Sequence, residues 1–251
     1  MYAGERVLDL GGKRQQAVLA VLLLHANQAV STTTLLECVW GDQPPDGGHR
    51  VIACYVHRLR KALAAATDQP EAEVIQSMPG AYQMSVGEDQ LDMDTFHQLV
   101  LTGRQERTQG DWQRAVRILR QALAMWRGTP LNGVPGPFAA MQRIRMHEYR
   151  TEVLVDCLDA DLAAGRHTEA MADLMDLAMS NPLHERVAEM LMIALYRCGR
   201  QTEALATFRR LRGEVKRKAR VEPNVRLRRL HQAILESAEP PPRDARISAQ
   251  L

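Results

Sequence analysis

The stretch RVIACYVHRLRK, residues 50–61, is the most informative part of this 251-residue chain. Apolar residues in and just after it recur at steps of four, three and four, the spacing of one helix face; they are Ile52, Val56, Leu59 and Leu63. The stretch holds three arginines, one lysine, one histidine and no acid. Because the basic groups fall mainly off the apolar stripe, they could reach phosphates and guanine edges. We therefore expect a helix with one anchored face and one cationic face, which suits the major groove of DNA.

The segments before and after this helix predict further helices, a loop and a hairpin, and their order along the chain indicates the type of domain. Residues 15–25 are strongly apolar and of helical length, and Ser31 is a good N-cap for a short second helix reaching Trp40. Residues 41–48, GDQPPDGG, predict a loop. Residues 74–86 read as two β-rich runs around a Pro-Gly turn, which predicts a hairpin. Three helices followed by a hairpin are the plan of a winged helix-turn-helix domain.

Four motifs make the resemblance more specific: LGGKRQQAVLA at 10–20, VWGD at 39–42, VHRLRKAL at 56–63 and PGAY at 79–82. In their order and spacing they resemble the OmpR-type DNA-binding domain, and more narrowly the Streptomyces antibiotic regulatory protein (SARP) family. The resemblance extends to about residue 237. It implies a mainly α protein with an OmpR-type winged helix-turn-helix domain at 1–90. A tetratricopeptide-like bacterial transcriptional activation domain at 91–238 and a disordered tail at 239–251 would follow.

The resemblance also implies roles for single residues. Arg58 would face the bases, Arg50, His57 and Arg60 would contact backbone phosphates, and Tyr82 would lie at the base of the wing. The full set predicted to contact DNA is Lys13, Arg50, His57, Arg58, Arg60, Lys61, Gln76 and Tyr82.

Three features depart from the family pattern. Met78 stands just before the wing turn, where the family often has a basic residue, and His57 replaces the first arginine of the usual Arg-Arg-Leu-Arg run. The segment before Val7 is short, so the small amino-terminal sheet is expected to be reduced, or the protein to begin upstream. Residues 1–90 contain 7 lysines and arginines against 10 acids, a net charge of −3. DNA binding would therefore depend on charge placement, and tight binding would need two or more protomers.

The second half predicts helical repeats. Three segments share a register, GDWQRA at 110–115, GRHTEA at 165–170 and GRQTEA at 199–204, and the last two are 34 residues apart, the tetratricopeptide period. In each, glycine would end one helix and alanine would begin the packing face of the next. A long helix is expected from Pro137 to about Ala164. Such repeats either bind a partner or serve only as a scaffold and dimer contact; the resemblance points to RNA polymerase and a second protomer.

Two further segments are rich in charged residues. Residues 209–230 hold 10 lysines and arginines against 2 acids. They are either a solvated helix face, an auxiliary contact to DNA phosphates or a docking surface for RNA polymerase. The carboxylates of Asp156, Asp159 and Asp161 are expected to face water, as acidic runs on helices usually do.

Composition favours a soluble, cytoplasmic protein. The longest apolar run, residues 17–24, is too short to span a bilayer and reads as a core helix. The four cysteines are widely spaced, so we expect buried, reduced thiols and neither zinc ligands nor disulfides. No phosphate-binding, zinc-protease, nucleophile-elbow or kinase motif is present, so no cofactor, metal or enzymatic activity is expected.

Three functions remain in view. The favoured one is a sequence-specific transcriptional activator, pathway-specific for antibiotic biosynthesis and of the short, stand-alone form. The resemblance implies that it binds direct repeats in promoter DNA as a side-by-side homodimer and recruits RNA polymerase holoenzyme. The second is a helical-repeat adaptor whose winged helix binds protein. The third is an enzyme with an unrecognised site.

Overall fold

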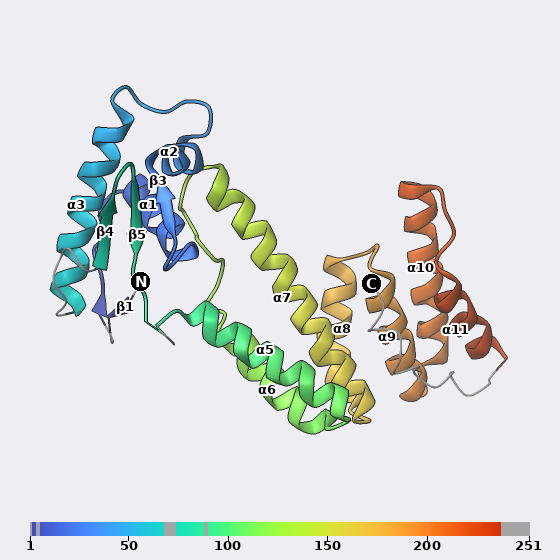
Figure 1. Ribbon diagram of the computed structural model, residues 1–251. Helices are drawn as coiled ribbons and strands as arrows, with labels where there is room; N and C mark the ends of the chain where they lie inside the picture. Colours follow the sequence, from blue (N-terminus) through green and yellow to red (C-terminus); the bar gives the residue numbers. More distant parts are fainter. Residues whose placement is uncertain (1, 4–5, 68–73, 88–89, 237–251) are drawn as a thin grey trace. The chain divides into compact units, whose positions relative to one another are not determined.

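The computed structural model describes residues 2–3, 6–67, 74–87 and 90–236 (Figure 1). The chain divides into two compact units, Met1–Gln98 with Ala122–Thr151 and Leu99–Gln121 with Glu152–Leu251. We call them the amino-terminal unit and the repeat unit. The fold class is mainly α, with a small sheet, as predicted. The domain boundaries at residues 90 and 238 stay predictions, and the segment 239–251 lies outside the described residues.

The first part of the amino-terminal unit contains helices α1, α2 and α3 and an antiparallel sheet of three strands in the order β3-β5-β4. Its elements are β1 (Tyr2–Ala3), β2 (Arg6–Val7), α1 (Lys13–Leu24), β3 (Ala29–Ser31), α2 (Thr32–Trp40), α3 (Gly48–Thr67), β4 (Ile75–Met78) and β5 (Ala81–Met84). Among the described residues, the pair β1–β2 has two residues in each strand.

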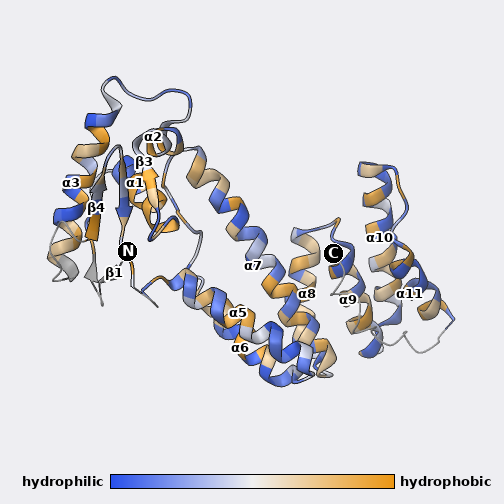
Figure 2. Ribbon diagram, in the orientation of Figure 1, coloured by the Kyte–Doolittle hydropathy of each residue, from blue (hydrophilic) through white to orange (hydrophobic). Residues whose placement is uncertain are grey.

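The predicted apolar stripe of α3 is its buried face. Ile52 and Leu59 are fully buried and Val56 and Leu63 nearly so. They pack in one core with the apolar residues of α1, which confirms the core-helix interpretation of residues 17–24. In Figure 2, α3 alternates hydrophobic and hydrophilic residues along its length, whereas α1 is mostly hydrophobic. As the sequence predicts, most of the cationic residues of α3 lie on the side of the helix that faces away from this core.

Strand β3 was not predicted. The sequence predicts only an N-cap at Ser31 here, and Ser31 does cap α2, since its Oγ accepts a hydrogen bond of 3.0 Å from the amide of Thr34. The three residues before α2 also pair with β5, Val30 opposite Tyr82, and so extend the hairpin to a three-stranded sheet. A strand of three residues with one buried side chain is too short for its alternation of exposed and buried residues to be recognised in the sequence.

A segment distant in sequence completes the core of this unit. Phe138, at the start of α7 (Pro137–Ala163), is 8 % exposed and packs in the same core as α1 and α3. Its ring centroid lies 5.5 Å from that of His25. The preceding Gly136 has φ +101°, and a Cβ there would lie 2.8 Å from the carbonyl oxygens of Cys38 and Val39. Only glycine therefore allows the chain to approach α2 this closely.

Helices α5 to α10 follow as three consecutive pairs, and α11 comes after them. Their bounds are α5 (Asp92–Gln109), α6 (Trp112–Ala124), α7, α8 (His167–Ser180), α9 (Glu185–Arg197), α10 (Gln201–Ala219) and α11 (Val225–Leu235). Gly110, Gly165 and Gly199 end α5, α7 and α9 with φ of +84°, +78° and +75°. After each glycine, the next amide bonds back to a carbonyl five residues earlier, as in a Schellman cap. The predicted repeat turns are confirmed.

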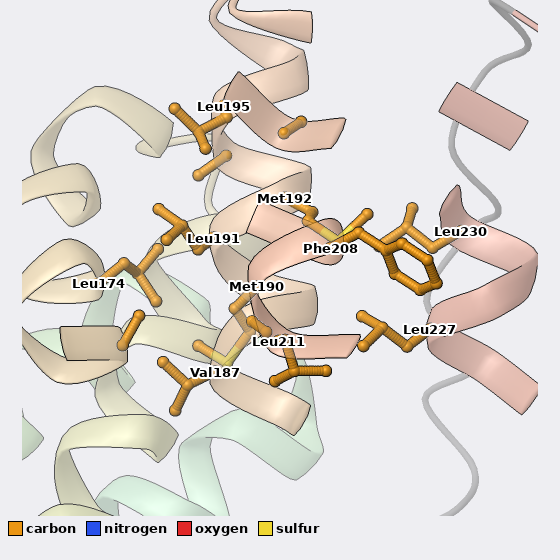
Figure 3. Packing of buried hydrophobic residues seen from close by; sticks show 14 of the residues in the cluster. Leu174, Val187, Met190, Leu191, Met192, Leu195, Phe208, Leu211, Leu227 and Leu230 are labelled. Atoms are coloured by element: carbon orange, nitrogen blue, oxygen red, sulfur yellow. The ribbon is translucent and has the colours of Figure 1, made fainter. Parts of the chain in front are cut away.

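The packing positions of the repeat are confirmed as well. Ala115, Ala170 and Ala204 are fully buried, one in each second helix of a pair. The bulky residue four positions on is buried too; these are Leu119, Leu174 and Phe208. Figure 3 shows the core that results in the repeat unit, with side chains of α8, α9, α10 and α11 in contact. Small residues let the paired helices approach, and large ones fill the space between pairs.

The prediction that three carboxylates of α7 face water is wrong. The side chain of Asp161 is 1 % exposed and accepts bonds from Arg120 at 2.9 Å and Arg166 at 2.5 Å. Asp156 and Asp159 belong to a row of ion pairs that we call the charged ladder, consisting of Arg104, Asp156, Arg107, Asp159, Arg186, Glu189 and Arg226. The ladder joins α5, α7, α9 and α11. Apart from Arg186 and Glu189, which are one helix turn apart, its ion-pair partners lie 27 to 52 residues apart in sequence, so no local sequence pattern predicts them.

The basic stretch 209–230 is partly neutralised by nearby acids. Arg212 and Lys216 both contact Glu222 at 2.7 Å, and their hydrogen bonds lower the pKa of Glu222 to about 2. Arg217 lies 2.6 Å from Glu214. Five further arginines of the stretch are exposed: Arg209, Arg210, Arg220, Arg228 and Arg229. The stretch is thus an ion-paired helix surface in part, and a contact of the remaining arginines with DNA or polymerase stays a prediction.

Lowering the pH is expected to weaken the packing of α11 on α10. His231 stacks on Phe208 at a centroid distance of 4.0 Å. Burial, together with the charges of Arg209 and Arg212, lowers the pKa of His231. A lowered histidine pKa means that the unfolded chain binds the proton better, so stability falls as the pH drops below about 6.5. The thermal midpoint should fall more steeply between pH 7.5 and 5.5 for wild type than for His231→Phe. Equal pH profiles would contradict this assignment.

All four cysteines are free thiols, but the expectation that they are buried holds only in part. Cys157 is buried, which raises the pKa of its thiol to about 12, whereas Cys54 and Cys198 are exposed. In the part of the chain that the structure describes, no cluster of histidine, cysteine or acidic side chains could hold a metal ion. None of the described helices combines the length and apolar content needed to cross a membrane.

Candidate nucleic-acid interface

The exposed face of α3 gathers most of the predicted DNA-contacting residues. Arg50, His57, Arg58 and Lys61 are all exposed. At 100° per residue they fall within about 100° of arc, opposite the buried stripe. Among the described residues, no hydrogen bond or ion pair occupies the side chains of Arg50, Arg58 or Lys61. We call these four residues the cationic face; its guanidinium and ammonium groups are available to an external anion.

Close packing at its beginning holds α3 in place. Gly47, with φ +64°, makes the turn from the loop, and its carbonyl accepts a bond of 2.8 Å from the amide of Arg50. Gly48 is buried, and a Cβ there would lie 2.7 Å from a methyl group of Leu36 on α2. Glycine thus lets the start of α3, which carries Arg50, pack closely against α2.

The wing is the hairpin β4–β5 with its turn at Pro79 and Gly80, as predicted. Gly80 has φ +68°, and its carbonyl accepts bonds from the amide and the hydroxyl of Thr32 at 2.9 and 3.1 Å. Residues 75–84, IQSMPGAYQM, include no lysine or arginine. Met78, at the position where the family often has a basic residue, is 42 % exposed. The surface of this wing therefore presents hydrogen-bonding groups, but no positively charged side chain.

Arg60 differs from its neighbours on α3. It is half-buried, and its Nε donates to the carbonyl oxygen of Ile75 at 2.7 Å while its Nη2 donates to the Oγ of Ser77 at 2.8 Å. The phosphate contact implied for Arg60 stays a prediction, but the structure gives this side chain an internal partner on the wing. Sequence reasoning missed this role because Ser77 lies 17 residues away and no motif links the two positions.

The other predicted residues are dispersed. Gln76 is exposed on β4, and its amide donates to the Oγ of Ser85 at 3.3 Å. Tyr82 is half-buried in the central strand β5, opposite Ser77, and packs on the core; its implied place at the base of the wing stays a prediction. Lys13 is exposed at the start of α1, with its Nζ near Gly133 of the loop before α7. The structure thus brings together the residues of α3, with Gln76 on the adjoining wing strand, and places Lys13 on another element.

An aromatic contact next to the cationic face was also missed. The rings of Trp40 and Tyr55 stack with centroids 6.3 Å apart and planes at 5°. The guanidinium of Arg14 lies 5.6 Å from the centroid of the Trp40 ring. One residue each from α1, α2 and α3 takes part, so this contact steadies the first turns of α3. The aromatic spacing gave no hint of it, because Trp40 and Tyr55 are on different helices.

Comparison with known proteins agrees with this geometry. Residues 6–81 match the family model described as "Transcriptional regulatory protein, C terminal", and residues 91–235 match "Bacterial transcriptional activator domain". The chain is 38 % identical over 231 residues to regulatory protein AfsR of Streptomyces coelicolor, covering 92 % of this chain but 23 % of AfsR. Against AfsR of Streptomyces griseus the covered share is 24 %. The chain thus spans about a quarter of the length of these relatives.

Relatives of similar length also match. The chain is 33 % identical over 241 residues to regulatory protein DnrI of Streptomyces peucetius, covering 94 % of this chain and 88 % of DnrI. A solved structure of Mycobacterium tuberculosis EmbR, in complex with a low-affinity phosphopeptide, superposes with a TM-score of 0.87 at 28 % identity, covering 92 % of this chain and 61 % of EmbR. The activation-domain model alone covers more than half of the chain. The chain belongs to the SARP family of transcriptional regulators.

Proposed function

We propose that this protein is a sequence-specific DNA-binding activator of transcription that controls antibiotic biosynthesis genes. The observation that carries the proposal is the cationic face of α3, whose side chains have no partner among the described residues while the opposite face is locked in the core. A rigid helix with unpaired guanidinium groups on one side is suited to the major groove. Membership of the family supports the regulatory role. The match to DnrI supports it further, because it covers most of the length of both proteins.

In this proposal, α3 enters the major groove of promoter DNA. Arg58 donates two bonds to O6 and N7 of a guanine, the commonest specific contact to a base. Arg50, His57 and Lys61 contact phosphates, which position the helix without reading sequence. Because the domain has a net negative charge and few cations, one copy binds weakly at physiological salt. Two copies bound side by side on direct repeats would supply the missing affinity.

The repeat unit has a separate role in the proposal. Its paired helices form the kind of scaffold that presents an extended surface to a protein partner. We infer that this partner is RNA polymerase holoenzyme, which would turn promoter binding into activation. The exposed arginines of residues 209–230 are one candidate contact.

Replacing Arg58 with alanine tests the base-reading role. Losing one bidentate contact to guanine should weaken binding by about 1–3 kcal/mol, and discrimination should relax at a single base pair. The measurement is a gel shift on a genomic promoter fragment that the wild-type protein binds, with single-base variants of the site. Arg145→Ala, which removes an exposed arginine from α7, is the matched control and should bind like wild type. Equal affinities of Arg58→Ala and wild type for every site would contradict the proposal.

A further inference from the structure

We propose that Arg60 is a positioning residue that fixes the wing against α3, so that the cationic face and the hairpin meet DNA as one rigid surface. This differs from the phosphate contact that family resemblance implies. The inference deepens the proposed function and depends on it for its consequence at DNA. Its structural part concerns the free protein and is measured without DNA.

The direction of the side chain separates Arg60 from the cationic face. Two residues along a helix turn the side chain by about 200°, so Arg60 lies far around α3 from Arg58. Arg60 sits at the border between the buried stripe and the cationic face, in keeping with its half-buried state. This border faces the wing, since both hydrogen bonds of Arg60 reach β4.

The acceptors on β4 explain why an arginine is needed. β4 is an outer strand, paired with β5 on one side only. The carbonyl of Val74 accepts from the amide of Ser85 on the β5 side. Successive carbonyls along a strand point to opposite sides, so the carbonyl of Ile75 lies on the unpaired edge, where Arg60 donates to it. A second nitrogen of the same guanidinium donates to the hydroxyl of Ser77 two residues on, so the planar fork of arginine bonds to β4 at two points with fixed geometry.

A second attachment holds the other end of the hairpin. Thr32 is 6 % exposed at the start of α2, and its amide and hydroxyl both donate to the carbonyl of Gly80 in the wing turn. The tip is thus tied to α2 and the outer strand to α3. Because residues 75–84 carry no cation, the wing adds little electrostatic affinity of its own. What it provides to recognition is a fixed geometry, and the Nε and Nη2 groups of Arg60 are engaged in maintaining it.

The first experiment measures hydrogen exchange of the β4 and β5 amides in the free protein. Arg60→Lys keeps the charge but loses the two-point bridge, and protection of these amides should fall roughly tenfold, as expected for lost bonds to a charged donor. Ser77→Ala removes one of the two bonds and should cause a smaller loss. The double variant should lose no more than Arg60→Lys alone. Lys61→Ala, the adjacent control, should leave protection unchanged. Unchanged protection in Arg60→Lys would overturn the proposal.

The second experiment measures DNA affinity against salt concentration for the same variants. If Arg60 only bound phosphate, Arg60→Lys would stay close to wild type and Ser77→Ala would have no effect, because lysine keeps the charge. The positioning role predicts roughly tenfold weaker binding for Arg60→Lys with an unchanged salt slope, and a smaller loss for Ser77→Ala. Lys61→Ala should reduce the slope by about 0.9. If wild type shows no specific DNA binding, the proposed function fails while the exchange result still decides the role of Arg60.

Discussion

Replacing Asp161 with alanine is expected to lower the free energy of unfolding of the repeat unit by about 3 kcal/mol, the lower end of the range for breaking a buried ion pair. The carboxylate is almost fully buried and binds Arg120 of α6 and Arg166 of the turn between α7 and α8. Without it, Arg166 loses this partner and Arg120 keeps only the longer contact to Asp173. Both arginines are partly exposed, which limits the cost to the lower end. Urea unfolding followed by circular dichroism measures the change.

Asp173→Ala is the matched control for this prediction. Asp173 contacts the same arginine, Arg120, at 3.4 Å, but its side chain is 42 % exposed. Exposed ion pairs contribute little, so this variant should lose less than about 1 kcal/mol. Hydrogen exchange should show the loss in Asp161→Ala concentrated in α7 and α8. Equal destabilisation by the two variants would show that burial of Asp161 does not matter.

Features with a local signature could be predicted from the sequence. The buried stripe of α3 follows from apolar residues at helical spacing, and the repeat turns follow from Gly110, Gly165 and Gly199, each followed five residues later by alanine. The N-cap at Ser31 likewise depends on residues three positions apart. Helix periodicity, capping and turn chemistry act over a few residues, so one sequence is enough to reveal them.

Features that depend on distant partners could not be predicted. Asp161 reads as a surface acid on α7 until Arg120, 41 residues earlier, is placed beside it. Arg60 reads as one more cation of the recognition helix until β4 is placed along the border of α3. In both cases a charged residue is what a solvent-exposed surface would also contain. Only the folded structure brings its hydrogen-bonding partner next to it. The roles of the cationic face at DNA stay predictions, because they concern a partner outside the chain.

Phe138→Ala is expected to cost the amino-terminal unit about 3–5 kcal/mol of unfolding free energy, the range for truncating a buried phenylalanine. Phe138 lies far in sequence from residues 6–81, which match the regulatory-protein family model, yet its ring is part of the core that holds α1 and α3. Its removal leaves a cavity beneath the helices that carry the cationic face. Urea unfolding followed by tryptophan fluorescence in a Trp112→Phe background measures the loss, because the remaining Trp40 and Trp126 both lie in this unit.

The control for Phe138→Ala is Ile144→Ala on the same helix. Ile144 is 62 % exposed, and alanine favours helix, so this change should alter stability by less than about 0.5 kcal/mol. The consequence for function follows from the same core. If α3 depends on Phe138 for its support, Phe138→Ala should lose DNA affinity as the temperature approaches its lowered midpoint, although every residue of α3 is intact. A variant as stable as Ile144→Ala would show that residues 6–98 form their core without α7.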